Sequence, residues 1–361
     1  MRIDGVRVGH VSVPMARPMR TAIHETTHTE VGVVEIHAGG LAGQGVTLSL
    51  RPHQAQATCA MLADLSEGLG GAEADDVTAL WDRMWVRLSL TGQSGIGVLA
   101  LSAIDTALWD LLAQQAGLPL HRLFGTRWPC LPVYAQPGWL SYSVGELCEE
   151  ALSFQEQGFR YYKMRVGSPD WRSDVHRVEQ VRSALGDTTQ VLVDANQGWS
   201  RREALAAGRA LDDLGLYWLE EPVDVADLEG CAAVARAIST PVAAGESVFG
   251  TAGFQPLIDH GAAAILMPDL QHCGGPSGFH RVAVQADLAG LPISSHMFTQ
   301  VSVHLMASSR NALLVEHMPG WWEHLFQPEL DIQQGMIRPP STPGTGFKLV
   351  DWAGETLNPV P

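Results

Sequence analysis

The sequence contains few cysteines and few basic residues. Its five cysteines among 361 residues are widely spaced and form no Cys-x-x-Cys motif, so we expect reduced, mostly buried thiols. Lys and Arg total 23 against 39 Asp and Glu, which gives a formal net charge of −16. A chain this acidic repels phosphate backbones and anionic lipids, which argues against nucleic-acid and membrane partners.

The sequence also lacks the long apolar segments of secreted or membrane proteins. The stretch Met1–Val6 has no apolar core of a signal peptide, and no continuous apolar run reaches about 18 residues. We therefore expect a cytoplasmic protein. With 46% hydrophobic and 17% charged residues, the composition is globular and excludes disordered, collagen-like and coiled-coil chains. The length predicts two domains, or one large barrel with an attachment.

The first part of the chain has the pattern of a separate α+β unit. Polar and apolar residues alternate over 2–8 and 30–36, which predicts an antiparallel meander. A polar loop is expected between them, over 14–29. Helical periodicity follows at 53–69, 72–90 and 98–116. We predict an α+β capping domain over 1–125.

Beyond residue 125, short apolar runs alternate with helical segments. Eight runs recur at intervals of about 20 to 30 residues, at 132–135, 161–166, 191–194, 217–220, 242–245, 264–267, 291–294 and 313–316. Such βα units close into a (β/α)8-type (TIM-like) barrel. A doubly wound sheet is the alternative, but no Gly-x-Gly-x-x-Gly follows any run. We predict an α/β fold with this barrel at 126–328 and a Pro- and Gly-rich segment at 329–361 that returns to the capping domain.

Three acidic residues end successive predicted strands. Asp194, Glu220 and Glu246 are spaced 26 and 26 residues apart, and the chemistry of such barrels lies at the carboxyl ends of the strands. Any one of them could be a helix N-cap or a surface charge. Three anions at one place repel one another unless a cation sits between them. Hard oxygen ligands suit Mg²⁺, with Mn²⁺ as a substitute.

Further charged residues end the other strands. Asp269 and His296 would form a dyad in which the carboxylate orients the imidazole as a base. Lys163 and Arg165 share one face of their strand and could offset the carboxylates or bind a substrate carboxylate. Arg cannot act as a base near neutral pH, whereas Lys163 can if its neighbours lower its pKa. Glu316 could protonate an enolate if apolar neighbours raise its pKa, or it could be a structural acid.

Together these motifs resemble the enolase superfamily, and within it the mandelate racemase subgroup of mandelate racemase/muconate lactonizing enzyme-like proteins. The resemblance covers nearly the whole chain. It rests on the helix Ala103–Asp110 and on Lys163-Met-Arg165, Asp194-Ala-Asn196-Gln197, Trp218–Pro222, Gly245-Glu246, Met267–Asp269, Gly274-Gly275, Ser294–Phe298 and Glu316. It implies Mg²⁺ on Asp194, Glu220 and Glu246, a general base formed by His296 with Asp269, and a hydrogen bond from Glu316 to the substrate carboxylate.

The resemblance also implies how substrate is held. Asn196 would contact a substrate hydroxyl beside the metal, and loops at 14–29 and 47–53 would close over the barrel. Arg20 and His24 are the candidate specificity residues. Polar residues of the first loop indicate a hydroxylated or diacid substrate, whereas Trp321 after the eighth run indicates an apolar or sugar-stacking wall; both alternatives stay open.

The second predicted strand departs from the family pattern. The family often has Lys-x-Lys there, and this chain has Arg165 at the second position. Racemisation needs proton exchange on both faces of the substrate, and dehydration needs one base. We therefore favour a Mg²⁺-dependent hydro-lyase that converts an acid sugar to a 2-keto-3-deoxy acid.

Other functions stay open at this point. The main alternative is a racemase, epimerase or cycloisomerase of a 2-hydroxy acid, acid-sugar lactone or related carboxylate, with Lys163 as the second base. A non-catalytic binding barrel would lack a ligand or dyad member, and a zinc hydrolase would need several strand-end histidines. We expect a homo-oligomer whose partner is a small carboxylate substrate.

Overall fold

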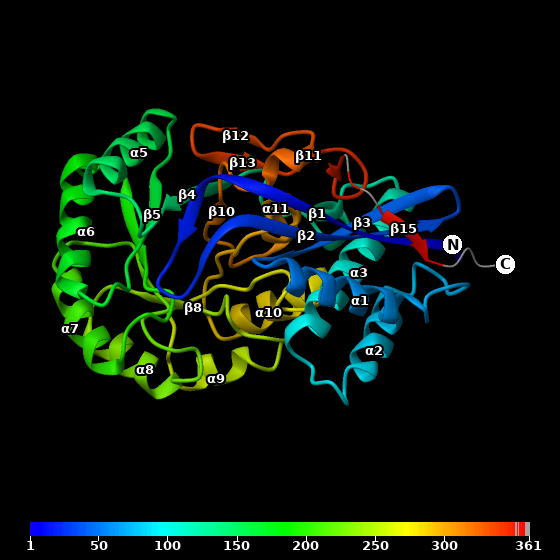
Figure 1. The fold of residues 1–361 in the computed structure, drawn as a ribbon, viewed down its shortest axis with the longest axis horizontal. Helices are drawn as coiled ribbons and strands as arrows, with labels where there is room; N and C mark the ends of the chain where they lie inside the picture. The colour runs from blue at the N-terminus through cyan, green and yellow to red at the C-terminus, as the bar shows by residue number, and fades with distance from the viewer. Residues whose placement is uncertain (351, 353, 358–361) are drawn as a thin grey trace.

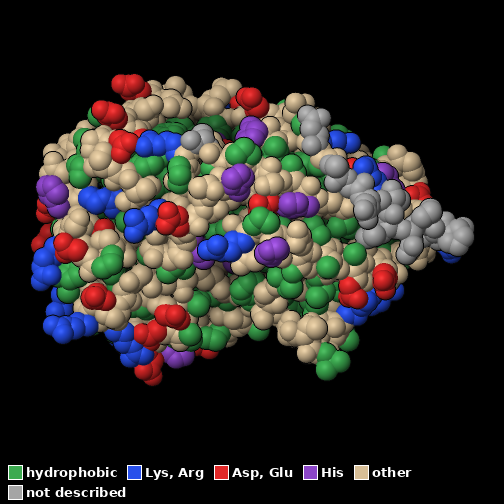
Figure 2. Space-filling view, in the orientation of Figure 1, with side chains coloured by type: hydrophobic (Ala, Val, Ile, Leu, Met, Phe, Trp, Pro, Cys, Tyr) green, Lys and Arg blue, Asp and Glu red, His purple; other side chains and the backbone are tan. Residues whose placement is uncertain are grey.

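The computed structural model describes residues 1–350, 352 and 354–357. The chain forms an antiparallel capping sheet with helices against it and a mostly parallel α/β barrel (Figure 1). The predicted fold class is therefore confirmed. On the face drawn in Figure 2, acidic and basic side chains are interspersed, and several histidines lie near the middle.

The capping sheet is built from long strands. Its order is β15-β1-β2-β3, with β1 at Ile3–Arg20, β2 at Glu25–Ala38, β3 at Leu41–Ser49 and β15 at Gly354–Leu357. The prediction of a loop over 14–29 is wrong. In the structure β1 and β2 continue through most of this segment as a two-stranded arm, and the chain turns only at 21–24. Pro14 and Pro18 made this segment look like a loop in the sequence, because proline has no N–H to donate to a neighbouring strand. The pairing of β1 with β2 changes register between Pro14 and Met19.

Three helices cover one side of this sheet. They are α1 at Pro52–Ser66, α2 at Val77–Arg87 and α3 at Gly95–Gln115. By length and composition α3 could cross a membrane, but 78% of its most apolar window is buried inside the protein, which is typical of a core helix. Gly43 and Gly45 of β3 let the strand backbone approach α3, because a Cβ at either position would overlap the carbonyl oxygen of Ala107 or Ala103.

The barrel contains seven parallel strands among the described residues. They are β4 at Leu131–Gly138, β5 at Tyr161–Arg165, β6 at Gln190–Asp194, β7 at Leu219–Glu220, β8 at Val242–Ala244, β9 at Ile265–Leu266 and β10 at Val315–His317. β10 pairs with β4 and closes the ring. The expected strand at 291–294 is only a series of single bridges, from Ile293 to Leu266 and to Ala312. It still occupies the seventh position.

Helices surround the barrel. They are α4 at Leu120–Phe124, α5 at Val144–Glu156, α6 at Trp171–Leu185, α7 at Arg201–Asp212, α8 at Leu228–Ala237, α9 at Phe254–Asp259, α10 at Gly275–Leu288 and α11 at Thr299–Ser308. The last part of the chain adds η1 at Glu323–Leu325, β11 at Phe326–Gln327, β12 at Asp331–Gln333, β13 at Met336–Arg338 and β14 at Lys348–Leu349. β13 pairs with β4, and β15 pairs with β1.

The β1–β2 arm reaches from the capping sheet onto the barrel (Figure 1). The backbone N–H of Leu140, after β4, donates to the Arg20 carbonyl at 3.0 Å. The methyl group of Ala22 faces Gly167 and Gly198, where a Cβ at Gly198 would lie 2.6 Å from it. These contacts hold the tip of the arm over the carboxyl ends of the strands.

The close approach of β3 to α3 makes a testable prediction. We expect Gly45→Ala to lower the free energy of unfolding by about 3 kcal/mol, because the added methyl must displace backbone rather than a flexible side chain. Gly145→Ala on α5 is the matched control, since a methyl added there meets nothing within 4 Å. Urea unfolding of both variants measures the effect, and equal stabilities would contradict the packing described.

A buried histidine joins α11 to α4 and to the C-terminal segment. His304 Nδ1 accepts from the His121 N–H at 3.2 Å, and its Nε2 donates to the Thr345 carbonyl at 2.8 Å. Burial lowers the pKa of His304 to about 3, and the nearby His121 acts in the same direction although the bond to Thr345 opposes it. His304 is therefore neutral in the folded protein near pH 7.

This pKa predicts how stability depends on pH. A histidine in the unfolded chain takes up a proton below pH ~6.5, so His304 favours unfolding increasingly as the pH falls from that value toward 3. We expect the stability difference between the wild type and His304→Gln to shrink by about 2 kcal/mol from pH 7 to pH 5. Urea unfolding at the two pH values measures it, and a constant difference would exclude a neutral His304.

Candidate active site

Three carboxylates meet at the mouth of the barrel. Asp194 and Glu220 end β6 and β7, Glu246 follows β8, and one oxygen of each lies within 4.8 Å of the others. All three side chains are buried. Burial, and then the charge of Asp194, raises the pKa of Glu220. The predicted cluster is thus assembled at a point where its charges destabilise one another.

Two oxygens at this cluster are positioned as ligands for a divalent cation. Among the described residues, Asn196 Oδ1 and Glu246 Oε2 are buried and accept no hydrogen bond, although Glu246 Oε2 lies 3.2 Å from His296 Nε2. Asn196 is held in place by Asp194, which accepts from its backbone N–H at 2.7 Å and from its side-chain nitrogen at 3.1 Å. Carboxylate and amide oxygens are the donors that Mg²⁺ prefers.

Two cations of β5 lie against these carboxylates. Lys163 Nζ is 2.9 Å from Glu220 Oε1 and 3.2 Å from Glu316 Oε1, and Arg165 Nη1 is 2.5 Å from Asp194 Oδ2. Burial lowers the pKa of Lys163, but the charges of Glu220 and Glu316 outweigh it and hold the pKa above its usual value. The lowered pKa that Lys163 would need to act as a base is therefore not found.

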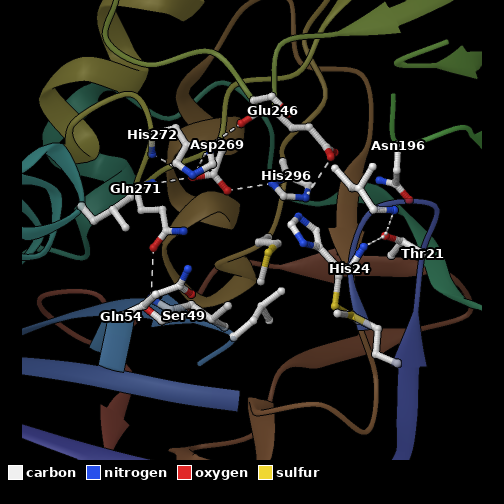
Figure 3. Close-up of a pocket in the computed structure, with 18 of the residues that line it drawn as sticks. Thr21, His24, Ser49, Gln54, Asn196, Glu246, Asp269, Gln271, His272 and His296 are labelled. Carbon is white, nitrogen blue, oxygen red and sulfur yellow. Dashed lines mark hydrogen bonds and ion pairs between the residues drawn. The ribbon is translucent and has the colours of Figure 1, made fainter. Parts of the chain in front are cut away.

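His296 and Asp269 form the predicted dyad. His296 Nδ1 is 2.7 Å from Asp269 Oδ2, and its Nε2 is 3.2 Å from Glu246 Oε2 (Figure 3). The other Asp269 oxygen accepts the backbone N–H groups of Gln271 and His272 at 2.8 and 2.9 Å. These bonds fix Asp269, and Asp269 orients the imidazole so that its Nε2 points toward the three clustered carboxylates.

The electrostatic surroundings of His296 follow from the same cluster. Burial lowers the pKa of its imidazole, but the charges of Glu246 and Glu316 and the bond to Asp269 raise the pKa to about 10. These carboxylate charges are the ones that a divalent cation would offset.

Glu316 is held by a backbone N–H group and by Lys163. It accepts the backbone N–H of Met297 at 2.6 Å and lies beside Lys163. Burial raises the pKa of its carboxyl, but the charges of Lys163 and His296 and the bond from Met297 lower the pKa to about 2. Glu316 therefore accepts hydrogen bonds in this arrangement, and its role as a donor to the substrate carboxylate stays a prediction.

Strained backbone gathers around the same point. Among the described residues, six that are not glycine have a positive φ, and five follow the ends of strands at the barrel mouth: Asn196, Gln197, Glu221, Met297 and Phe298. Such conformations cost about 1–3 kcal/mol each and persist where function requires them. Short sequence motifs at these positions gave no signal of this strain.

Four of the charged residues, Arg165, Glu246, Asp269 and His296, line a cavity of about 330 Å³ beneath the arm. Asn196, His24 and Trp321 line it, as predicted for substrate-binding residues. Arg20 does not line it and is exposed, because side chains alternate along β1 and Met19 is the one that faces inward. The proposed role of Arg20 is therefore not supported by its position.

Several lining residues had not been singled out from the sequence. From the barrel they are Gln197, Ser247, Gln271, His272, Met297 and Met318, and from the cap Met19, Thr21, Ser49 and Gln54. Some lie next to residues that were predicted, since Gln271 and His272 directly follow the Asp269 strand end. The cap residues become neighbours of the site only because the arm and α1 fold over the barrel.

Two family models match the chain. One, described as the mandelate racemase/muconate lactonizing enzyme N-terminal domain, matches residues 3–125, and one described as enolase C-terminal domain-like matches residues 146–353. A 3,6-anhydro-alpha-L-galactonate cycloisomerase of Streptomyces coelicolor is 34% identical over 92% of this chain and 94% of its own. An L-talarate/galactarate dehydratase of Salmonella typhimurium is 32% identical over 98% and 90%.

Solved structures agree with these matches. The L-talarate dehydratase of Polaromonas sp. JS666, complexed with Mg and L-glucarate, has a TM-score of 0.91 and 34% identity and covers 98% of this chain and 99% of its own. A racemase of Streptomyces coelicolor A3(2) with bound magnesium has a TM-score of 0.92 and 33% identity over 96% and 97%. The predicted Mg²⁺-dependent enzyme is confirmed at the level of the family. The chain belongs to the mandelate racemase/muconate lactonizing enzyme subgroup of the enolase superfamily.

Proposed function

We propose that this enzyme removes the proton alpha to the carboxylate of an acid sugar and then expels the β-hydroxyl, which yields a 2-keto-3-deoxy acid. The observation that carries the proposal is the His296–Asp269 dyad, which lines the cavity beside the carboxylate cluster. The names of the Salmonella and Polaromonas relatives, both dehydratases of acid sugars, support the reaction class.

Asp194, Glu220 and Glu246 would hold Mg²⁺. When bound, the cation supplies positive charge that stabilises the enediolate formed from the substrate carboxylate. Lys163 adds a second, fixed positive charge on the same side, because Glu220 and Glu316 hold it in place. The dyad lies on the other side of the cluster, beside Glu246.

The proton transfers are carried by His296. Its Nε2 takes the α-proton, and the electron pair of the C–H bond enters the carboxylate to form the enediolate. The β C–O bond then breaks, and the imidazolium returns the proton to the departing hydroxide, which leaves as water. Asp269 keeps Nδ1 protonated and orients the ring throughout. The resulting enol tautomerises to the 2-keto acid, so the net change is loss of one water.

The position of the β5 cations favours abstraction from one face. Lys163 has no exposed surface and does not line the cavity, whereas Arg165 does. A racemase needs a second base on the opposite face, and an arginine is a poor one. A dehydratase needs only His296. A cycloisomerase also needs a single base, and the name of the Streptomyces coelicolor relative keeps that reaction as the second candidate.

Proton NMR in D₂O with Mg²⁺ and a library of acid sugars tests the reaction. We expect the α-proton signal of one C2 epimer to disappear while deuterated 3-deoxy-2-keto signals grow. With anhydro and lactone forms added to the library, opening of the ring to a 3-deoxy-2-keto product without loss of water would identify the cycloisomerase instead. Exchange of both C2 epimers, or interconversion between them, would contradict one-face abstraction and make a second base necessary.

The role of His296 has a specific test. We expect His296→Asn to abolish α-proton exchange, because the variant loses the imidazole nitrogen that is proposed to take the proton, while Mg²⁺ affinity stays within a few-fold. Asp269→Asn should slow exchange by about 10²-fold or more, through loss of the correct tautomer. His176→Gln, an exposed change on α6, is the control. Exchange at the normal rate in His296→Asn would exclude His296 as the base.

Two adjacent glutamates provide a matched test of the metal site. We expect Glu220→Gln to weaken Mg²⁺ binding at least tenfold, since it removes one of three clustered charges. Glu221 is the control, because its carboxylate is held by Gln197 and Ser247 at 2.9 Å and lies outside the three-carboxylate cluster. Titration calorimetry of both variants measures the affinities. Equal losses, or none, would show that the ligands are assigned wrongly.

A further inference from the structure

The cavity has a charged side and an uncharged side. Glu246, Asp269 and His296 lie at one side, where the reaction is proposed to occur, and Ser49 and Gln54 of the cap lie across the cavity from them (Figure 3). A substrate bound by its carboxylate at the charged side must therefore extend its other end toward the cap.

Neutral hydrogen-bonding groups surround the cap side. Gln271 is fixed because its side-chain oxygen accepts the backbone N–H of Leu48 at 3.0 Å. That bond leaves the amide nitrogen of Gln271 directed into the cavity (Figure 3). The Gln54 amide and the Ser49 hydroxyl line the same region. These are donors and acceptors suited to substrate hydroxyls.

An apolar wall forms the rest of the cavity. Trp139 and Trp321 meet edge to face with ring centroids 6.2 Å apart, and both are buried and line the cavity with Met297 and Met318. Aromatic rings of this kind cover the C–H face of a sugar chain and exclude water. The Arg165 guanidinium lies 5.3 Å from the Trp139 ring centroid, so this wall adjoins the charged side of the cavity.

The cap side has no lysine or arginine among the described lining residues. Among the described lining residues, Arg165 is the only lysine or arginine, and it is already 2.5 Å from Asp194 at the charged side. Burial, with the charges of Arg51 and Arg165, lowers the pKa of His24, so its imidazole is uncharged near pH 7. Arg51 itself is exposed and lines a separate outer groove with Glu25 and His28.

We propose that the substrates are aldonates, sugar acids with one carboxylate and an uncharged hydroxylated far end, and that the cap side of the cavity rejects aldarates, which carry a carboxylate at both ends. This rests on the proposed function, because that function places the reacting carboxylate at the metal cluster. A second carboxylate beside Gln54 and Gln271 would have no lysine or arginine among the described lining residues to pair with there. A hydroxyl in the same place keeps its hydrogen bonds.

Matched aldonate and aldarate pairs derived from glucose, galactose, mannose, xylose and arabinose test this with the Mg²⁺-loaded enzyme. Titration calorimetry measures binding, and α-proton exchange in D₂O is followed separately. We expect the best aldonate to bind at least tenfold more tightly than any aldarate. An aldarate that binds equally well or better, or a panel in which nothing binds, overturns the inference. Aldonate binding without exchange would support the ligand class and overturn the proposed reaction.

A charge placed at the cap side gives a second test. Gln54 is exposed at the first turn of α1, so Gln54→Arg should fold normally and add a cation at the far end of the substrate. We expect it to raise aldarate affinity about tenfold relative to aldonate affinity. Gln56→Arg makes the same charge change on the same helix at an exposed position that does not line the cavity.

The controls decide between a local and a general effect. The aldonate preference should be unchanged in Gln56→Arg and in Arg51→Gln. An equal gain in Gln56→Arg would show that only net charge had acted, and would contradict a reading of the far end by Gln54. Loss of aldarate binding in Arg51→Gln would show that Arg51 reaches the substrate, which also overturns the inference.

Discussion

Mutual repulsion among buried carboxylates is the constraint on which this structure depends. Three of them share one small space at the barrel mouth, with oxygens inside 4.8 Å of one another, and Glu316 and Asp269 lie close by. The protein opposes this charge with Lys163, Arg165 and His296, each in direct contact with at least one carboxylate. The three clustered carboxylates and the His296–Asp269 dyad are thus held in place by the same charges.

The cap is joined to the barrel by buried polar contacts rather than by apolar packing alone. Asp105 of α3 accepts both the backbone N–H and the hydroxyl of Ser277 at 2.8 Å, at the start of α10. The indole of Trp81 donates to the Gly274 carbonyl at 2.7 Å. Because removing one partner of such a bond leaves a buried polar group unsatisfied, these contacts fix the position of the cap. These bonds attach α2 and α3 to the start of α10.

This division explains how one scaffold supports many reactions. The floor holds the charged residues at strand ends, and the roof comes from β1, β3 and α1, whose side chains line the opposite side of the cavity. Replacing a neutral glutamine of the roof by arginine, as in Gln54→Arg, changes the charge of the cavity without changing the three clustered carboxylates. In this chain the roof is neutral, and Arg165 occupies the position from which a second base would act.

The sequence by itself determined the fold class, the barrel and the set of strand-end groups. Short apolar runs separated by helical segments indicate βα units. Acidic residues at the ends of successive parallel strands lie close together, because parallel strands end at the same edge of the sheet. The motifs around Asp105 and Gly274-Gly275 can be read from the sequence. The hydrogen bond between Asp105 and Ser277 joins residues 172 positions apart, so the sequence near either residue does not predict it. The length of the β1–β2 arm was hidden by Pro14 and Pro18.

Only the tertiary structure decided which side chains face the cavity. Arg20 and Met19 are neighbours in sequence, and the phase of one strand sends Met19 inward and Arg20 to solvent. Lys163 and Arg165 share a strand face, yet burial beneath Glu220 and Glu316 removes Lys163 from the cavity while Arg165 reaches it. The ionised state of Glu316 likewise depends on Lys163, which is distant from it in the chain. Exposure and electrostatic environment come from long-range packing, and a linear pattern carries no measure of them.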